Sequence, residues 1–182
     1  LIDPYSDNSL GVNWTTSEVP FGDGDFGTPG LPNASSGILL EIDNIAGWNL
    51  IGLPVDVVDG NYLEIFPEAN TGTLYAYNGM YIDAETLTPG IGYWLRFDSD
   101  GTSVIEGLEI FSLAIELVEG WNLVTGITSS VSVTLIQDPD GIIVPGTIYE
   151  FDGSYENTTT LVPGKGYWIR TYSAGVIILS SE

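Results

Sequence analysis

The sequence LTPGIGYWLR at residues 87–96 returns almost unchanged as LVPGKGYWIR at residues 161–170, and this return decides how the chain folds. Two other landmarks recur in the same order: GWNL at 47–50 and 120–123, and LYAYNGMY at 74–81 as IYEFDGSY at 148–155. The offset is 73 residues for GWNL and 74 for the other two landmarks, so one unit is present twice. Duplication is a common way to build scaffolds and binding arrays, and it makes a single active site less expected.

The pattern within each repeat predicts β-strands. Large apolar residues recur at every second position at 38–42 and again at 111–115, the period of two that a half-buried strand shows. In residues 93–97 the alternation places Tyr93 on one strand face and Trp94 and Arg96 on the other. Asn-Gly and Asp-Gly pairs predict a hairpin in each repeat, because both residues tolerate positive φ. No stretch with helical periodicity exceeds two turns, so we expect an all-β protein.

The expected architecture is two homologous tandem β-sandwich-like units with an extended N-terminal strand segment. The segment covers residues 1–36 and is rich in Gly and Pro, β repeat 1 covers 37–110 and β repeat 2 covers 111–182. Within the segment, one strand is expected from an apolar stripe of period two. Because a lone strand is not stable, it should add to a sheet edge of its own chain or of a neighbouring subunit. The residues of this expected donor strand are Leu10, Val12 and Trp14.

Charge and composition exclude several classes of function. Acidic residues number 25 against three basic ones, which gives a formal net charge of −22. Nucleic acid and anionic lipid would find no clusters of Lys and Arg for their phosphates, so we expect neither as a partner. The chain has no Cys and no His, which removes disulfides, thiolate zinc sites and the usual general base. We therefore expect no enzyme and, since no apolar run is long enough for a membrane span, no membrane insertion.

Together the landmarks resemble a β-repeat of large secreted bacterial surface proteins. That repeat reads Gly-Trp-Asn-Leu-Ile-(Gly/Ser)-x-Pro, then Tyr-x-Tyr-x-x-Gly-x-Tyr, then Pro-Gly-x-Gly-Tyr-Trp. The first copy matches at 47–54 and 89–94, and at 75–81 with one residue instead of two before the Gly, whereas the second departs at 125–128, where the proline is missing. NWTT at 13–16 followed by GTPGLPN at 27–33 is similar to the end of a lamin-tail domain in bacterial surface proteins. The resemblance implies an extracellular or cell-surface module with a structural or accessory role, and the acidic, lysine-poor composition favours the same location.

Aromatic residues at equivalent repeat positions are the first candidates for a functional surface. In one interpretation they form the structural core of the repeats or their interface, because aromatic side chains dominate packing in β-sheets. In the other, exposed Trp and Tyr rings stack on sugars, as in carbohydrate-binding modules. The residues concerned are Trp48, Tyr93, Trp94, Trp121, Tyr167 and Trp168.

Two of the three basic residues, Arg96 and Arg170, occupy the same repeat position. Each lies two residues beyond a Trp and so on the same strand face, where it can make a cation–π contact or pair with a carboxylate. We expect a structural role for both arginines, with ligand binding as the alternative.

Acidic residues with the spacing Asp-x-Asp are the candidates for a metal site. The spacing occurs in Asp98-Ser99-Asp100 and Asp138-Pro139-Asp140, and also at residues 23–25. It opens calcium loops, but Asp and Gly also suit the positions of solvated β-turns. Calcium is the one cofactor that the sequence suggests.

These observations favour a secreted structural subunit or surface module that self-associates. Its partners would be copies of itself or adjacent surface-protein domains, and head-to-tail donation of the N-terminal strand would build an open filament. The alternative is a carbohydrate-binding or adhesive module of a larger secreted protein, with glycans as partners.

Overall fold

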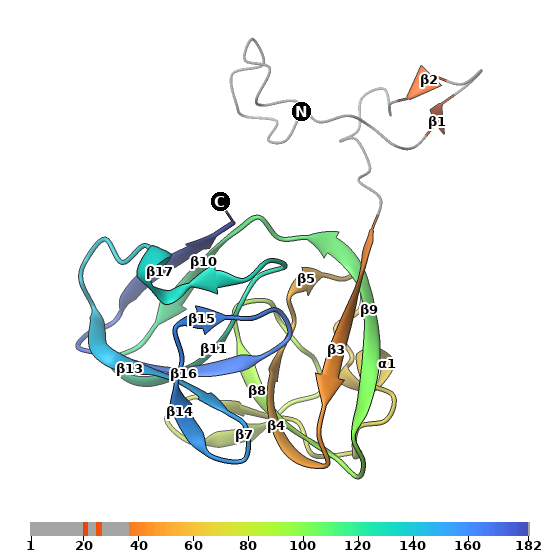
Figure 1. Cartoon of the computed structure of the whole chain (residues 1–182), viewed down its shortest axis with the longest axis horizontal. Coiled ribbons are helices and arrows are strands. Elements are labelled where there is room, and N and C mark those ends of the chain that lie inside the picture. The colour runs from red at the N-terminus through yellow and green to blue at the C-terminus, as the bar shows by residue number, and fades with distance from the viewer. Residues whose placement is uncertain (1–19, 22–24, 27–36, 182) are drawn as a thin grey trace. The chain divides into compact units, whose positions relative to one another are not determined.

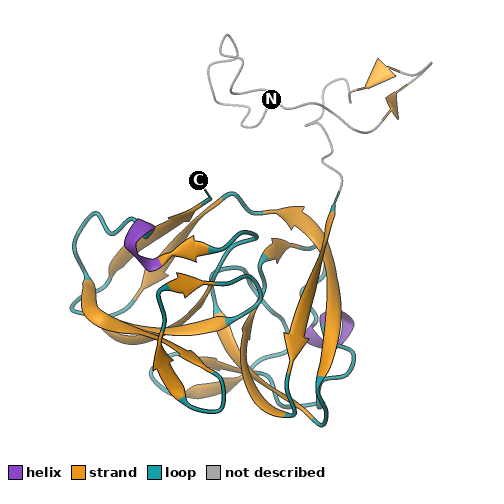
Figure 2. Ribbon diagram, in the orientation of Figure 1, coloured by secondary structure: helices purple, strands orange, loops and turns teal. Residues whose placement is uncertain are grey.

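The computed structural model describes residues 20–21, 25–26 and 37–181 (Figure 1). Strands fill most of these residues, and the helical elements among them are one short α-helix and one short 3-10 helix (Figure 2). The prediction of an all-β fold is confirmed. The chain divides into two compact units, residues 1–38 and 39–182. In the first unit, β1 (Pro20–Phe21) pairs antiparallel with β2 (Asp25–Phe26). The expected donor strand at Leu10, Val12 and Trp14 lies outside the described residues.

Repeat 1 contains two sheets. The larger has four antiparallel strands in the order β4-β8-β6-β7, and the smaller has the order β3-β9-β5. A short helix, α1 (Tyr62–Ile65), follows β5, and the side chain of Asn61 caps it by accepting from the N–H of Leu63. The strands are β3 (Ile38–Asn44), β4 (Gly47–Gly52), β5 (Val55–Asp56), β6 (Tyr75–Tyr77), β7 (Tyr81–Asp83), β8 (Gly92–Phe97) and β9 (Gly101–Glu109).

Repeat 2 has the same arrangement. Its larger sheet has the order β11-β16-β13-β14, which matches repeat 1 strand for strand, and β10 pairs with β17 in place of β3 with β9. Two short strands, β12 and β15, pair separately, and a 3-10 helix (Val133–Leu135) follows β12. The strands are β10 (Ser112–Leu117), β11 (Gly120–Thr125), β12 (Val131–Ser132), β13 (Ile143–Phe151), β14 (Tyr155–Asn157), β15 (Thr160–Leu161), β16 (Gly166–Thr171) and β17 (Gly175–Ser180).

Both expected hairpins are present, but their loops have three residues. Tyr77 pairs with Tyr81, so Asn78, Gly79 and Met80 connect β6 to β7. Gly79 has a φ of 75°, whereas no described residue other than glycine has a positive φ. The turn therefore has one left-handed residue, which suits a three-residue loop, rather than the two that an Asn-Gly two-residue turn requires. β13 and β14 are connected in the same way.

Alternation along the strands sorts the side chains between two environments. In β8, Tyr93, Leu95 and Phe97 are buried whereas Arg96 is exposed, as the sequence predicts. In repeat 2 the corresponding face of the large sheet packs against the β10–β17 sheet, so this repeat is a two-layer sandwich. The residues that form its core from these two sheets are Ile115, Leu117, Val124, Ile148, Tyr167, Ile169, Ile177 and Leu179.

The Gly-Trp-Asn-Leu landmark builds the turn from the smaller sheet to the larger one. Gly120 has a φ of 97°, a conformation that favours glycine. The Asn122 side chain donates to the carbonyl oxygen of Val118 at 2.8 Å and accepts from its N–H at 2.9 Å. Asn49 makes the same two bonds with Ile45 in repeat 1. The Gly and Asn of this landmark thus have a structural role in the turn. The Trp between them lies on the outer face of the sheet.

Contacts between the repeats are reciprocal. Ile51 forms a β-bridge with Lys165, and the equivalent residues of the exchanged repeats, Val124 and Ile91, form another. Contacts that exchange in this way define an isologous interface, the kind that relates two subunits of a symmetric dimer. The two repeats are therefore related by a pseudo-two-fold axis within one chain.

The Pro-Gly-x-Gly landmark of each repeat makes a backbone hydrogen bond to the other repeat. The N–H of Gly52 donates to the carbonyl oxygen of Gly164 at 3.0 Å, and the N–H of Thr125 donates to that of Gly90 at 3.3 Å. The second glycine of the motif permits the close approach, because a Cβ on Gly166 would lie 2.9 Å from the carbonyl oxygen of Ile51. A motif that reads as a turn in the sequence thus joins the two repeats.

Candidate functional site

The outer faces of the two large sheets carry the tryptophans. Trp94 lies beside Leu50 in the register of β4 and β8, and Trp168 lies beside Leu123 in the register of β11 and β16. Leu50, Leu123 and Trp168 form a buried cluster, against which Trp94 is partly buried. The outer faces therefore meet between the repeats, on the side of each sheet that is turned away from its sandwich core.

Reciprocal aromatic contacts cross this interface. The ring of Trp94 packs edge-on against Phe151 of the other repeat, with centroids 4.8 Å apart. Trp168 packs against Tyr77 in the same way, also at 4.8 Å. Phe151 is the repeat equivalent of Tyr77, so the two contacts are related by the pseudo-two-fold axis. In each repeat, an aromatic residue at the tip of the β-hairpin thus packs against the large sheet of the other repeat.

Further rings extend both contacts into chains of five aromatic side chains with centroid separations of 4.8 to 6.3 Å. Trp48 or Trp121 stands toward one end of each chain, and a hairpin tyrosine at the other end. The first chain is Tyr75, Trp48, Trp94, Phe151 and Tyr155, and the second is Tyr149, Trp121, Trp168, Tyr77 and Tyr81.

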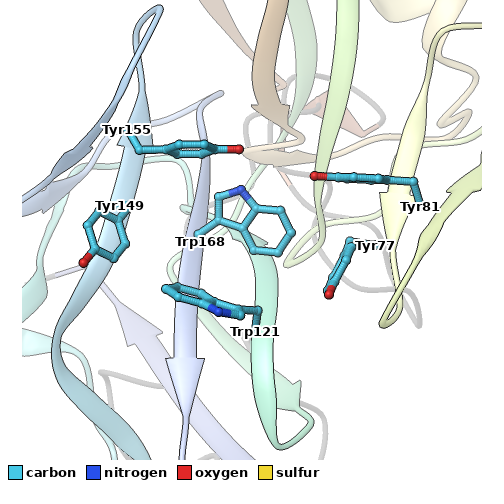
Figure 3. A pocket seen from close by; sticks show the side chains of 6 residues that line it. All are labelled: Tyr77, Tyr81, Trp121, Tyr149, Tyr155 and Trp168. Atoms are coloured by element: carbon cyan, nitrogen blue, oxygen red, sulfur yellow. The ribbon is translucent and has the colours of Figure 1, made fainter.

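Each chain of aromatic rings borders an open groove. The second chain borders the groove that we call the first, and the first chain borders the second groove. The first groove, of about 400 Å³, is shown in Figure 3, where six aromatic side chains from both repeats surround it. The second, of about 450 Å³, is its repeat equivalent. Tyr81 borders both grooves, so they are neighbours. The first is lined by Tyr77, Tyr81, Trp121, Tyr149, Tyr155 and Trp168, and the second by Trp48, Tyr75, Tyr81, Trp94 and Phe151.

Solvent exposure differs sharply along the chains. Trp168 at the centre is 8% exposed, whereas Trp48 and Trp121 are 42% and 39% exposed. The hairpin tyrosines Tyr81 and Tyr155 are 53% exposed. Trp168 is interface packing, whereas the exposed tryptophans and hairpin tyrosines present part of their surface to solvent.

The arginines lie on the same outer faces as the exposed tryptophans. Arg170 pairs in register with Trp121, and its guanidinium carbon lies 6.0 Å from the centre of that indole ring. The predicted cation–π contact is therefore present at Arg170, but with the Trp of the neighbouring strand rather than with Trp168 on its own strand. Arg96 stands in register with Trp48 at the equivalent place. Both guanidinium groups are exposed.

The first groove also holds an unpartnered polar group. The buried indole N–H of Trp168 makes no hydrogen bond of good geometry. It lies close to the hydroxyl of Tyr155, and Figure 3 shows that hydroxyl directed toward the hydroxyl of Tyr81. Burial raises the pKa of Tyr155 above its ordinary value, Tyr81 raises it further, and the Trp168 N–H offsets part of the rise. The Tyr155 hydroxyl thus remains a neutral donor and acceptor at the groove.

Tyr93 and Tyr167, which the sequence groups with the tryptophans, lie elsewhere. Both are buried in the sandwich cores, and their hydroxyls accept a backbone N–H, from Thr88 at 3.2 Å and from Val162 at 2.6 Å. Burial raises the pKa of both hydroxyls, that of Tyr167 to about 12. They fix the loop before each Pro-Gly-x-Gly segment and do not line the grooves.

The candidate calcium ligands are engaged in turns. Both carboxylate oxygens of Asp138 accept backbone N–H groups, from residues 142 and 143 at 2.9 Å. Asp140 lies within the turn that the N–H of Gly141 closes onto Asp138. Asp100 accepts from the N–H of residue 46 at 2.8 Å, and Asp98 from the Asn70 side chain at 2.9 Å. Across the part of the chain that the structure describes, no three acidic side chains gather where a cation could bind.

The sequence alone does not indicate several of the residues that line the grooves. They are the aromatic residues of the hairpin landmark at 74–81 and 148–155: Tyr75, Tyr77, Tyr81, Tyr149, Phe151 and Tyr155. The signal was present, because aromatic identity persists in the two copies while the residues between change. The sequence predicts only a hairpin at this landmark, since the contact with the other repeat is not visible in local sequence.

Comparison with known proteins identifies no relative: no family model, curated protein or solved structure matches the chain. Within the described residues, no helix has the length and apolar character needed to cross a membrane. What the protein does must therefore be argued from the two grooves.

Proposed function

We propose that the protein is a carbohydrate-binding module with two sites, one in each aromatic groove, and that its ligands are neutral polysaccharides. The observation that carries the proposal is the pair of equivalent grooves lined by Trp, Tyr and Phe rings. Sugar rings present flat arrays of C–H groups that stack on aromatic faces, and small-molecule sites commonly combine such apolar walls with a few polar groups.

Packing alone accounts for only part of the aromatic cluster. Burial stabilises an aromatic side chain by removing its apolar surface from water. Trp168 gains this stabilisation, but Trp48 and Trp121 leave about two fifths of their surface in solvent. Exposed large apolar side chains gathered in one place are typical of a binding surface. Trp48 and Trp121 therefore fit a ligand better than they fit a structural role.

Polar groups at the grooves suit sugar hydroxyls. Each exposed Trp has an Arg in register beside it, next to the groove although not in its lining, and a guanidinium offers several N–H donors in one plane. Tyrosine hydroxyls in the first groove can both donate and accept. The ligand is neutral because the chain carries a net charge of −22, which repels anionic polysaccharides.

Affinity electrophoresis tests the proposal. Native gels containing soluble neutral polysaccharides, such as a β-glucan, a xylan, a galactomannan and a galactan, should retard the protein in at least one case. The double variant Trp48→Ala/Trp121→Ala should lose at least about tenfold in affinity, since tenfold corresponds to only about 1.4 kcal/mol of lost contact. Tyr172→Ala is a matched control, because Tyr172 is 63% exposed and lines neither groove. Equal retardation of the double variant and the wild type would contradict the proposal.

The location that goes with this function is extracellular or at a cell surface, where polysaccharides are found. The resemblance of the repeats to those of secreted bacterial surface proteins supports this location. In that setting the module would serve adhesion beside other domains of a larger protein.

A second candidate function, self-association, is favoured by one observation. Among the described strands, β10 pairs only with β17, so one edge of β10 has no partner. An open edge can accept a strand from another chain, and the segment with Leu10, Val12 and Trp14 is the donor that the sequence suggests. Donation to a neighbour would build a filament, whereas donation to the same chain would close the edge.

Deletion of residues 1–36 tests this second function. A full-length chain that forms polymers in analytical ultracentrifugation, together with a truncated chain that stays folded and monomeric, would support donation between chains. A full-length chain that is monomeric at every concentration would rule out self-association.

A further inference from the structure

The pseudo-two-fold axis constrains how the two grooves can be used. Tyr81 borders both grooves and lines the first together with Tyr155, its repeat equivalent, and Figure 3 shows the two hydroxyls directed toward each other, so these two tyrosines meet near the axis. The grooves therefore flank the axis on one face. Rotation by half a turn about such an axis reverses direction along the face. The order of lining side chains in one groove, from the exposed Trp to the hairpin Tyr, thus runs opposite to the order in the other.

A polysaccharide has a direction, because its two ends differ. A strand that makes a given set of contacts in one groove must run in the opposite direction to make the same contacts in the other. One unbroken polysaccharide strand that passes over both grooves therefore cannot make the same contacts in each of them. A pair of strands that run antiparallel to each other can do so.

We propose, on the basis of the proposed function, that the module cross-links two neutral polysaccharide strands in antiparallel orientation, one strand in each groove. Each groove has its own exposed tryptophan, Trp121 in the first and Trp48 in the second, and its own arginine beside that tryptophan. Neither site needs the other for its stacking platform. A chain with two independent sites of this kind links separate polymers in the way that a bivalent binder does.

The residue type at one equivalent position differs between the grooves, and this should give the two sites different affinities. Tyr77 lies beside Trp168 in the first groove, whereas its equivalent beside Trp94 in the second groove is Phe151. At this position the first groove consequently has a hydroxyl that the second groove lacks. We expect the first groove to bind a given sugar more tightly than the second.

The experiment uses the full chain and the polysaccharide of the panel that retards it most strongly. Calorimetry with a short oligosaccharide of that polymer should show about two sites per chain, and Trp121→Ala or Trp48→Ala should each leave about one. Light scattering of the polymer should rise when wild-type protein is added and fall again at excess protein. Each single variant should still be retarded in gels but should raise scattering at least about tenfold less, because one remaining site cannot bridge two strands. Circular dichroism confirms that both variants are folded, and Tyr172→Ala controls for the loss of an exposed ring.

Three results separate the possibilities. One oligosaccharide per chain, with binding lost in both single variants, would show that a single strand spans both grooves and would overturn cross-linking. Two sites without any rise in scattering would overturn it too. Either result leaves carbohydrate binding intact, whereas the absence of any retardation across the panel would overturn the proposed function itself.

Discussion

Gly52 and Thr125 occupy equivalent positions in the two repeats and meet at the pseudo-two-fold axis, where only one of them can have a side chain. A Cβ on Gly52 would overlap the side chain of Thr125. Thr125 is fully buried, and its hydroxyl donates to the carbonyl oxygen of Lys165 at 3.0 Å. The backbone contacts of the interface are therefore reciprocal, but only repeat 2, through Thr125, places a side chain at the axis.

This arrangement predicts that the threonine at the axis can be supplied by position 52 instead of position 125. Gly52→Thr alone should lower the free energy of unfolding by about 2–3 kcal/mol, because it places two side chains in the space of one. The exchange Gly52→Thr/Thr125→Gly should recover most of that loss, since the hydroxyl then reaches the carbonyl oxygen of Ile91, the equivalent of Lys165. Urea unfolding of the two single variants and the double variant gives the coupling directly. A double variant that shows only the sum of the single losses would contradict the axial relationship.

The aromatic chains predict a graded response to truncation. Trp168→Ala should destabilise the protein by about 3–5 kcal/mol, the usual range for removing a buried aromatic side chain. Trp48→Ala should cost less than about 1.5 kcal/mol, because much of its ring is already in water. Thermal or urea unfolding measures both. Equal losses would mean that the exposed tryptophans are structural after all.

Local features of the fold could be predicted from the sequence, because they depend on residues close together in the chain. The alternation of Tyr93, Leu95 and Phe97 with Trp94 and Arg96 gives the two faces of β8 directly. The hairpins follow from the Asn-Gly and Asp-Gly pairs, although their three-residue loops do not. Two copies of each landmark give the repeats.

The grooves could not be predicted, because they depend on how the repeats meet. Nothing near Trp168 in the sequence indicates that its partner is Tyr77, some 90 residues earlier, or that Phe151 replaces this partner in the second groove. The burial of Trp168 also follows from contact with the other repeat. A period-two pattern assigns a side chain to a face, but it does not say what covers that face.

The Asp-x-Asp turns predict stability that does not depend on calcium. Asp138→Ala should cost about 1–3 kcal/mol, because it leaves two backbone N–H groups at residues 142 and 143 without their acceptor. Thermal melts with calcium and with a chelator should show the same loss in both conditions. A loss that appears only in the presence of calcium would indicate a cation site at this turn.

The buried tyrosines predict a loss of stability at alkaline pH. Burial raises the pKa of Tyr167 from its ordinary value of 10.0 to about 12, and it raises that of Tyr93 as well. Between these two pH values the unfolded chain releases the Tyr167 proton while the folded chain keeps it. The folded state then binds more protons, so stability falls as pH rises, by up to about 1.4 kcal/mol per pH unit, and levels off above the folded pKa. Below pH 10 this contribution is fully present.

Tyr167→Phe separates this effect from general alkaline unfolding. The variant should be less stable than the wild type at neutral pH by about 1–2 kcal/mol, because the N–H of Val162 loses the hydroxyl that accepts it at 2.6 Å. It should also lose stability less steeply between pH 10 and 12, because the ionising group is gone. Urea unfolding at a series of pH values measures both quantities, with Tyr172→Phe as the control for an exposed tyrosine. An unchanged slope in Tyr167→Phe would show that other groups cause the alkaline loss and that this hydroxyl acts only as a hydrogen-bond acceptor.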